Sequence, residues 1–162
     1  MKLCPRLYKG VGMKKENFME VTFKALSINE GFARICVAGF CVQLNPSIDE
    51  IGDIKTAVSE AVTNCVVHAY PKGNGTITMR CEIVGDTIKI SVKDKGIGIK
   101  DIDKAREPFF TTKPDEERSG MGFSVMESFM DKVDVERNPD QGLTVTMYKQ
   151  IGSNKALQVE NA

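Results

Sequence analysis

The chain has 162 residues, of which 41% are hydrophobic and 27% are charged, and 22 basic residues balance 22 acidic ones. This composition is typical of one ordinary globular domain, and no apolar run approaches the roughly 20 residues of a membrane-spanning helix. The balanced charge provides no basic excess for phosphate backbones, so we expect neither a membrane nor direct nucleic-acid binding.

The five cysteines are odd in number and form no C-x-x-C pair, which argues against a disulfide framework and against a zinc site. Cys36, Cys41 and Cys65 fall on apolar faces, as small buried residues do. We therefore expect reduced thiols and a cytoplasmic protein. Residues 1–12 lack the apolar stretch of a signal peptide and are predicted to be an extension that is either disordered or not native to the protein. The domain is expected over 13–152, followed by a flexible tail over 153–162.

The first half of the domain predicts one strand and two helices. Alternating apolar residues predict a strand over 19–26, and Asn29 can cap a helix that ends near Leu44. The expected buried stripe of this helix is Phe32, Ile35, Cys36 and Phe40. Ser47 and Glu50 form an S-x-x-E capping box that predicts a second helix to about residue 70.

The second half predicts hairpins around one more helix. "TITMRCEIV" and "TIKISVKD" alternate in polarity and meet at Gly85-Asp86, which predicts a hairpin. Residues 94–120 break all periodicity and are long enough for a functional lid. A third helix is expected over 121–133, and then strands over 133–137 and 143–151. Since hairpins give antiparallel neighbours, we predict an α+β, two-layer sandwich with helices on one face of a mixed, mainly antiparallel sheet.

The second helix carries Glu60, Asn64 and His68 at intervals of four residues, which places them along one face. The amide oxygen of Asn64 is a ligand that Mg²⁺ accepts while it keeps waters and substrate phosphates. Glu60, one turn earlier, is a candidate general base for an attacking hydroxyl. The alternative is that both are solvated helix residues. His68 is predicted to be structural.

Two glycine-containing motifs suggest a nucleotide. In "DKGIGI", Gly96 and Gly98 permit close approach of a ligand, and the Asp94 carboxylate can accept a hydrogen bond from the exocyclic amino group of adenine. A plain turn after a strand is the other interpretation. In "SGMGF", Gly120 and Gly122 open the third helix, where free amides and the helix dipole favour phosphate oxygens. A simple flexible cap would have the same sequence.

The long loop before the third helix supplies hydroxyl and cationic side chains, namely Thr112, Lys113 and Arg118. Such groups are suited to closing over a triphosphate, although an ordinary solvated loop explains them equally. The chain contains neither G-x-x-x-x-G-K-[ST] nor a helix-opening G-x-G-x-x-G, so the two commonest nucleotide fingerprints are absent.

Taken together, E-x-x-x-N on a helix, D-x-G-x-G, "TTK" and G-x-G at a later helix start resemble the GHKL ATPase and kinase superfamily. "ALSINEGFAR", "IKTAVSEAVTN", "FTTKPDEERSGMGF" and "MESFMD" are similar to the sporulation anti-sigma-F factors, a family of protein serine kinases from spore-forming Gram-positive bacteria. The likeness runs from about residue 21 to 151. It implies a Bergerat fold and a cytoplasmic homodimer that binds ATP or ADP with Mg²⁺ beneath a mobile lid.

The resemblance also implies roles for single residues. Glu60 would be the general base, Asn64 the Mg²⁺ ligand and Asp94 the adenine reader. The remaining nucleotide contacts would be Gly96, Gly98, Thr112, Lys113, Arg118, Ser119, Gly120, Met121 and Gly122. Arg34, in the matching "NEGFAR", would contact a protein partner, although as a surface arginine it needs no such explanation.

The implied function is to hold a sigma factor away from RNA polymerase and to phosphorylate a serine of an anti-anti-sigma factor. A competing hypothesis is a nucleotide-gated binding module without phosphotransfer, which would not need Glu60. A third is the catalytic domain of a histidine kinase, which expects a neighbouring phosphoacceptor helix bundle that this chain has no room for.

Overall fold

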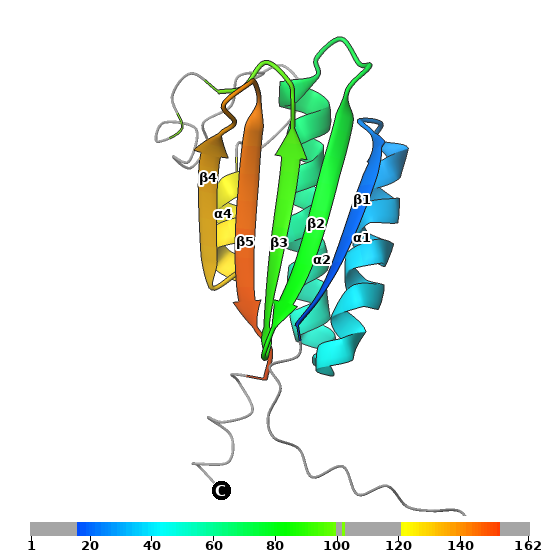
Figure 1. The fold of residues 1–162 in the computed structure, drawn as a ribbon, viewed down its shortest axis with the longest axis vertical. Coiled ribbons are helices and arrows are strands. Elements are labelled where there is room, and N and C mark those ends of the chain that lie inside the picture. The colour runs from blue at the N-terminus through cyan, green and yellow to red at the C-terminus, as the bar shows by residue number, and fades with distance from the viewer. Residues whose placement is uncertain (1–15, 100–101, 103–120, 153–162) are drawn as a thin grey trace, which may run out of the picture.

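A computed structural model describes residues 16–99, 102 and 121–152, and it places the alternating apolar segments in one five-stranded sheet. Helices cover one face of this sheet, as Figure 1 shows, and leave the other face open. The predicted α+β, two-layer sandwich is therefore confirmed. The extension expected over 1–12 and the tail expected over 153–162 lie outside the described residues.

The sheet is antiparallel at every described pair, in the order β1-β2-β3-β5-β4. Its strands are β1 (Glu16–Lys24), β2 (Thr76–Val84), β3 (Thr87–Asp94), β4 (Lys132–Arg137) and β5 (Leu143–Gln150). The predicted hairpin between β2 and β3 turns at Gly85, where φ is 67°. We expected a mixed sheet, but no two neighbouring strands among those described are parallel. A helical crossover joins β3 to β4, and β5 lies between these two strands in the sheet.

Helix α1 (Ile28–Cys41) buries only part of the predicted stripe: Phe40 is buried and Cys36 is half-buried against the core, but Phe32 and Ile35 are not buried. The buried residues are Ala33, Val37, Phe40 and Cys41, whereas Phe32 is 46% exposed and Ile35 is 73% exposed. The helix therefore turns Ala33 and Val37 into the core and leaves Phe32 and Ile35 toward the outside. Asn29 lies inside the helix and donates to Lys24 O at 2.8 Å, so it is not the cap we expected.

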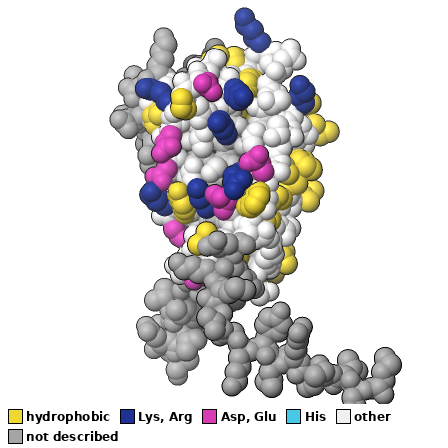
Figure 2. Space-filling model, viewed as in Figure 1, with side chains coloured by type: hydrophobic (Ala, Val, Ile, Leu, Met, Phe, Trp, Pro, Cys, Tyr) yellow, Lys and Arg dark blue, Asp and Glu magenta, His cyan; other side chains and the backbone are white. Residues whose placement is uncertain are grey.

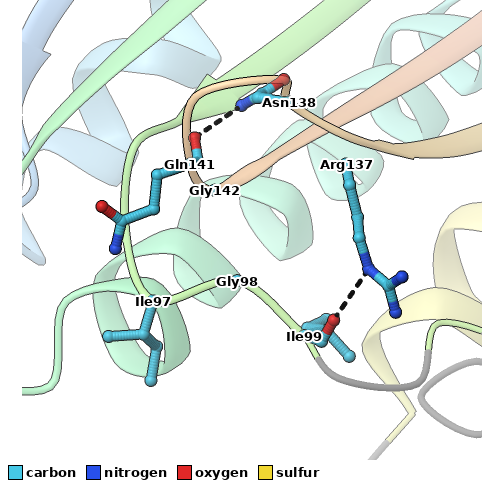
Figure 3. Close-up of a pocket in the computed structure, with 7 residues that line it drawn as sticks. All are labelled: Ile97, Gly98, Ile99, Arg137, Asn138, Gln141 and Gly142. Carbon is cyan, nitrogen blue, oxygen red and sulfur yellow. Dashed lines mark hydrogen bonds between the residues drawn. The ribbon is translucent and has the colours of Figure 1, made fainter.

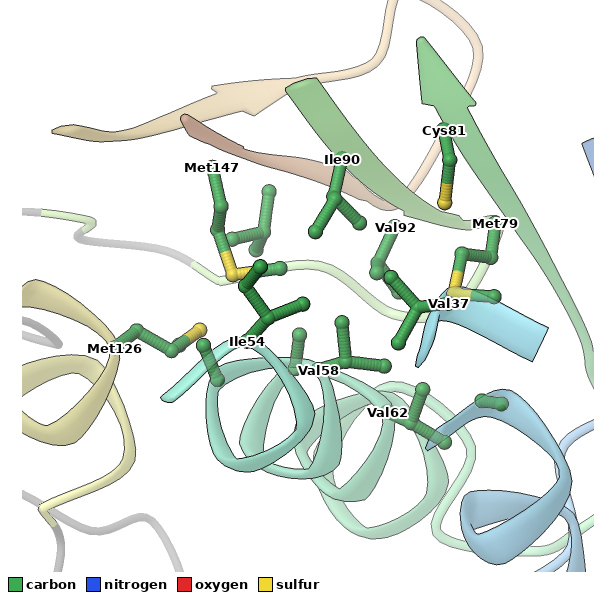
Figure 4. Close-up of a cluster of buried hydrophobic side chains, with 14 of the residues drawn as sticks. Val37, Ile54, Val58, Val62, Met79, Cys81, Ile90, Val92, Met126 and Met147 are labelled. Carbon is green, nitrogen blue, oxygen red and sulfur yellow. The ribbon is translucent and has the colours of Figure 1, made fainter. Parts of the chain in front are cut away.

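Helix α2 (Ile48–Asn64) is the centre of the helical layer, and its predicted capping box is confirmed. The amide of Glu50 donates to Ser47 Oγ at 3.2 Å, and Ser47 N donates to Glu50 Oε2 at 2.7 Å. Figure 4 shows side chains of α2 directed at the sheet, where they meet residues of β2, β3 and β5. The fully buried members include Ile54, Val58, Val62, Met79, Ile90, Val92 and Met147. Each large buried side chain contributes about 1.5–3 kcal/mol of transfer free energy.

The predicted second helix does not run uniformly to residue 70. After Asn64 the chain forms a π-helical turn, η2 (Cys65–Ala69), closed by a bond from Tyr70 N to Cys65 O at 3.2 Å. Such a turn inserts an extra residue and shifts the side-chain register. His68 therefore does not continue the regular i, i+4 series of Glu60 and Asn64.

Helix α4 (Gly122–Phe129) is shorter than the predicted 121–133. Met130 has an extended ψ of 150°, and the chain then enters β4 at Lys132. Met126 and Met130 are buried as expected, while Phe129 is 37% exposed. In the described part of the chain, no helix combines the length and apolarity needed to cross a membrane.

The open face of the sheet is polar, as the charged side chains in Figure 2 indicate. Arg80 lies between Glu20 and Glu82, at 3.5 Å and 3.0 Å, and Lys89 reaches Glu82 at 3.1 Å. Phe18 is 61% exposed on β1 and lies under the Arg80 guanidinium, 4.4 Å from it. One solvated face and one buried face explain the alternating sequence of these strands.

Candidate functional site

The structure brings Glu60 and Asn64 to the start of α4. A Cβ atom placed on Gly122 would lie 3.2 Å from Glu60 Oε2, from Asn64 Oδ1 and from Asn64 Nδ2. Both side chains are half-buried, in the last two turns of α2, which packs along α4. A residue without a side chain at 122 therefore leaves a small cradle between an acid, an amide and a helix N-terminus. This juxtaposition brings the E-x-x-x-N pair of α2 together with the G-x-G motif that opens α4.

Asp94 ends β3 as a buried carboxylate that is only 4% exposed. Its Oδ1 accepts a hydrogen bond from Gly96 N at 2.8 Å, and its Oδ2 lies 3.8 Å from Cys65 Sγ. Burial raises the pKa of Asp94, although the donors Gly96 N, Leu143 N and Cys65 Sγ act in the opposite direction. The pKa of the Cys65 thiol lies well above its usual range because of burial and the neighbouring Asp94 charge. Cys65 thus stays protonated and donates to the carboxylate.

The turn after β3 lies directly against the π-helical turn. Ile97 N donates to Ala69 O at 3.0 Å, and a Cβ on Gly96 would lie 2.2 Å from that same oxygen. Since real Cβ atoms do not approach a backbone oxygen so closely, only glycine fits at 96. Tyr70 braces the same turn, because its hydroxyl accepts from Lys95 N at 2.7 Å and donates to Thr76 O at 2.8 Å.

The turn between β4 and β5 belongs to this region, and the sequence analysis missed it. Asn138 Nδ2 donates to Asp94 O at 2.8 Å. Gly142, with φ of 85°, is so close that a Cβ there would lie 2.4 Å from Asp94 O and 2.6 Å from Asp94 Oδ1. The only signal in the sequence is the turn-forming segment "NPDQG". That signal predicts a hairpin, but it does not reveal that the hairpin contacts β3.

A hollow of about 250 Å³ opens between the turn after β3 and the β4–β5 turn (Figure 3). Its lining residues are Ile97, Gly98, Ile99, Arg137, Asn138, Gln141 and Gly142. Arg137 crosses one end, where its Nε donates to Ile99 O at 3.2 Å. Gly98 has φ of 71°, a left-handed conformation that glycine adopts without strain.

Comparison with known proteins identifies this arrangement. Residues 27–149 match the family described as histidine kinase-like ATPase domain. An anti-sigma F factor of a Thermoanaerobacter species is 54% identical over 143 residues, which cover 88% of this chain and 100% of the relative. The chain belongs to the anti-sigma F factor family. The anti-sigma F factor of Bacillus subtilis is 46% identical over 88% of this chain and 98% of its own length.

Two solved structures support the same fold for this anti-sigma F family member. The RsbU and RsbW domains of a Mycobacterium tuberculosis protein superpose with a TM-score of 0.61 at 20% identity, over 83% of this chain and 32% of that one. The nucleotide-free catalytic domain of the histidine kinase ThkA gives a TM-score of 0.53 at 19% identity, over 83% of this chain and 96% of its own. The predicted GHKL fold and family are therefore confirmed.

Several site residues predicted for this anti-sigma F family member lie outside the described ranges. These are Thr112, Lys113, Arg118, Ser119 and Gly120. Their roles as lid and phosphate contacts stay predictions. Met121 is described and stands at the N-cap position of α4, where it makes no side-chain cap hydrogen bond.

The predicted partner residue Arg34 lies on α1, where its Nε forms an ion pair with Glu30 Oε1 at 3.1 Å. Glu30 also accepts a hydrogen bond from Ser59 of α2, the residue before Glu60. The Arg34 side chain is 44% exposed. It is accessible to a partner protein, although nothing in a single chain distinguishes it from an ordinary surface arginine.

Proposed function

We propose that the chain is an ATP-dependent protein serine kinase that also binds and inhibits a sigma factor. The observation that carries the proposal is the cradle formed by Glu60, Asn64 and Gly122, with the buried Asp94 carboxylate beyond the end of the same helix. A pure binding module would need the nucleotide contacts but would not need an acid beside them. The names of the relatives support the anti-sigma half.

In this proposal Asp94 recognises the adenine base by a hydrogen bond. Its carboxylate is held by Gly96 N and Cys65 Sγ, in a setting from which bulk water is excluded. A carboxylate accepts hydrogen bonds only, so it favours the exocyclic amino group of adenine over the carbonyl of guanine. Adenine selectivity should therefore depend on Asp94 staying ionised.

The oxygen atoms at the cradle are suitable ligands for Mg²⁺. Asn64 Oδ1 is a hard oxygen ligand, and Glu60 Oε2 borders the same point. The described residues contain no group of three or more histidine, cysteine, aspartate or glutamate side chains that could hold a metal by themselves. Mg²⁺ commonly uses one or two protein ligands and completes its shell with waters and phosphates, so Asn64 is a sufficient anchor. When bound, the metal would neutralise charge on the phosphates.

Glu60 then acts on the acceptor serine. It lies one helical turn before Asn64, on the side of α2 that faces Gly122, and is half-buried. A carboxylate in this position can accept the proton of a serine hydroxyl as the hydroxyl oxygen attacks the terminal phosphorus. The first residues of α4 present backbone amides at the same place, which favours the phosphate oxygens.

The names of the relatives support a sigma factor as a partner. We propose that a nucleotide-bound homodimer holds a sporulation sigma factor of the sigma F type, with Arg34 in the contact, and that the phosphorylated substrate is an anti-anti-sigma factor. The cysteines in the described part of the chain, Cys36, Cys41, Cys65 and Cys81, are all free thiols. Free thiols are consistent with the reducing cytoplasm in which such a complex would act.

The decisive experiment is a phosphotransfer assay with ATP, Mg²⁺ and a serine-bearing anti-anti-sigma partner. Glu60→Gln should abolish transfer while it preserves ATP binding and sigma-factor binding. Glu136→Gln, on the exposed part of β4, is the matched control and should transfer normally. Full phosphorylation by the Glu60→Gln protein would remove Glu60 from the mechanism. ATP-dependent sigma binding by a wild-type protein that transfers no phosphate would favour the nucleotide-gated module instead.

A further inference from the structure

Two side chains of the β4–β5 turn reach the two ends of the segment that contains Gly96 and Gly98. Asn138 Nδ2 donates to the carbonyl of Asp94 at 2.8 Å, and Arg137 Nε donates to the carbonyl of Ile99 at 3.2 Å. The hollow seen in Figure 3 lies between these two attachments. The turn therefore holds the glycine segment at its ends and leaves space along its middle.

The carboxamide of Asn138 is fixed by several hydrogen bonds at once. Besides Asp94 O, its Nδ2 donates to Gln141 O at 3.3 Å, and its Oδ1 accepts from Thr144 Oγ1 at 2.6 Å. The backbone amide of Asn138 also donates to Gly142 O at 3.0 Å. The side chain here donates twice and accepts once. A carboxamide can do this, whereas a carboxylate cannot donate and a hydroxyl has only one hydrogen to donate.

The backbone carbonyl of Asp94, which accepts from Asn138, influences the orientation of the Asp94 carboxylate. Gly96 N donates to Asp94 Oδ1, so the carboxylate closes an Asx turn with the amide two residues on. The geometry of that turn depends on the orientation of the peptide plane between Asp94 and Lys95. Two hydrogen bonds hold this plane: Asn138 Nδ2 donates to its carbonyl, and its amide, Lys95 N, donates to the Tyr70 hydroxyl at 2.7 Å. Asn138 is the partner on the carbonyl side, and the flexible glycines that follow do not hold the plane.

We propose that Asn138 is a positioning residue for adenine recognition, because it sets the peptide plane from which Asp94 presents its carboxylate to the base. This inference rests on the proposed function, in which Asp94 reads the exocyclic amino group. Asn138 touches neither base nor phosphate in this role. Its loss should therefore weaken only the part of the affinity that comes from the amino group.

The test compares ATP with purine riboside triphosphate, which lacks that amino group, in calorimetric titrations of the full chain with Mg²⁺. Wild-type protein should prefer ATP by about tenfold, the usual effect of one hydrogen bond to a charged group. Asn138→Ser, whose side chain is too short to reach Asp94 O, should bring this ratio close to one, with the affinity for the analogue unchanged. Asn17→Ser, on β1 at the far edge of the sheet, is the matched control and should keep the wild-type ratio.

The inference is overturned if Asn138→Ser weakens both nucleotides equally, which is the result of a merely structural role, or if it weakens neither. Should that variant fail to fold, Thr144→Val removes the hydroxyl that orients Asn138 and should lower the same ratio to a smaller extent. An unchanged ratio in Thr144→Val would then refute it. A wild-type chain that binds neither nucleotide would instead refute the proposed function and take this inference with it.

Discussion

Replacing Gly122 by alanine separates folding from ligand binding. Gly122 is the first residue of α4 and is not among the residues with positive φ, so alanine is compatible with its backbone. In a helix interior alanine is favoured over glycine by up to about 1 kcal/mol. The new Cβ would lie 3.2 Å from side-chain ends of Glu60 and Asn64, which need to move only a few tenths of an ångström. We therefore expect the free energy of unfolding to change by less than about 1 kcal/mol.

The same methyl group should strongly reduce the affinity for Mg²⁺ and ATP. It occupies the cradle and displaces Asn64 Oδ1 from the point it shares with Glu60 Oε2. Loss of one contact to a charged group costs about 1.5–3 kcal/mol, or roughly 10- to 150-fold in affinity. If Asn64 acts through the metal, this loss should be large in the presence of Mg²⁺ and small with EDTA.

Thermal unfolding and ATP titration, each with and without Mg²⁺, measure the two effects of Gly122→Ala. Gly39→Ala is the matched control, because Gly39 lies in α1 and a Cβ there would have nothing within 4 Å. It should be at least as stable as wild type and should bind ATP normally. If Gly122→Ala bound Mg²⁺ and ATP as tightly as Gly39→Ala, the phosphates would not lie at this cradle and the assignment of Asn64 would be wrong.

Three further changes test the electrostatics and the scaffold. Burial raises the pKa of Asp94 from its ordinary 3.8, so its contribution to stability is complete below that pH and is lost as pH rises through the raised pKa. The free energy of unfolding of Asp94→Asn, relative to wild type, should therefore increase between these two pH values and then level off. A difference that does not change with pH would contradict the assignment. Lys149→Met should lower the free energy of unfolding by about 1–3 kcal/mol, because the Lys149 side chain is only 12% exposed and its Nζ donates to Asp53 Oδ2 at 3.0 Å. The exposed ion pair of Lys132 is the control, and Lys132→Met should leave the free energy of unfolding close to that of the wild type. Equal effects in the two variants would refute the role of burial. Ser47→Ala should cost about 1 kcal/mol through loss of the capping box, as measured by urea denaturation, and no change would mean that the cap is redundant.

The features that the sequence predicted correctly depend on short-range chemistry. The capping box requires only Ser47 and Glu50, and the hairpin at Gly85 requires only a tight turn between alternating segments. The spacing of Glu60 and Asn64 on one helix is likewise local. The sequence places Glu60 and Asn64 on one helix and Gly122 at the start of another, and the packing of α4 along α2 brings them together.

The features that the sequence did not predict depend on which elements become neighbours. The exposed Phe32 and Ile35 are as apolar as the buried residues of α1, so periodicity alone cannot select the face that meets α2. The last residue of the π-helical turn, Ala69, accepts from Ile97 N, a contact between segments that are distant in the sequence. The contact of Asn138 with Asp94 needs β5 to lie beside β3, an order that no local pattern contains.

The two halves of the proposed site differ in how closely the glycines pack against their neighbours. Around Asp94, glycines at 96 and 142 lie against backbone atoms at hypothetical Cβ distances of 2.2 Å and 2.4 Å, so that region cannot yield without moving main chain. At the cradle the neighbours are the movable ends of Glu60 and Asn64, at 3.2 Å. Discrimination between bases needs a fixed acceptor, since a displaced carboxylate would accept from many donors. At the proposed phosphate site, side-chain ends that can shift by a few tenths of an ångström allow a metal and phosphates to enter, and phosphoryl transfer then depends on how these groups are positioned. A rigid base site beside a phosphate site that adjusts on binding is compatible with the proposed adenine-specific kinase.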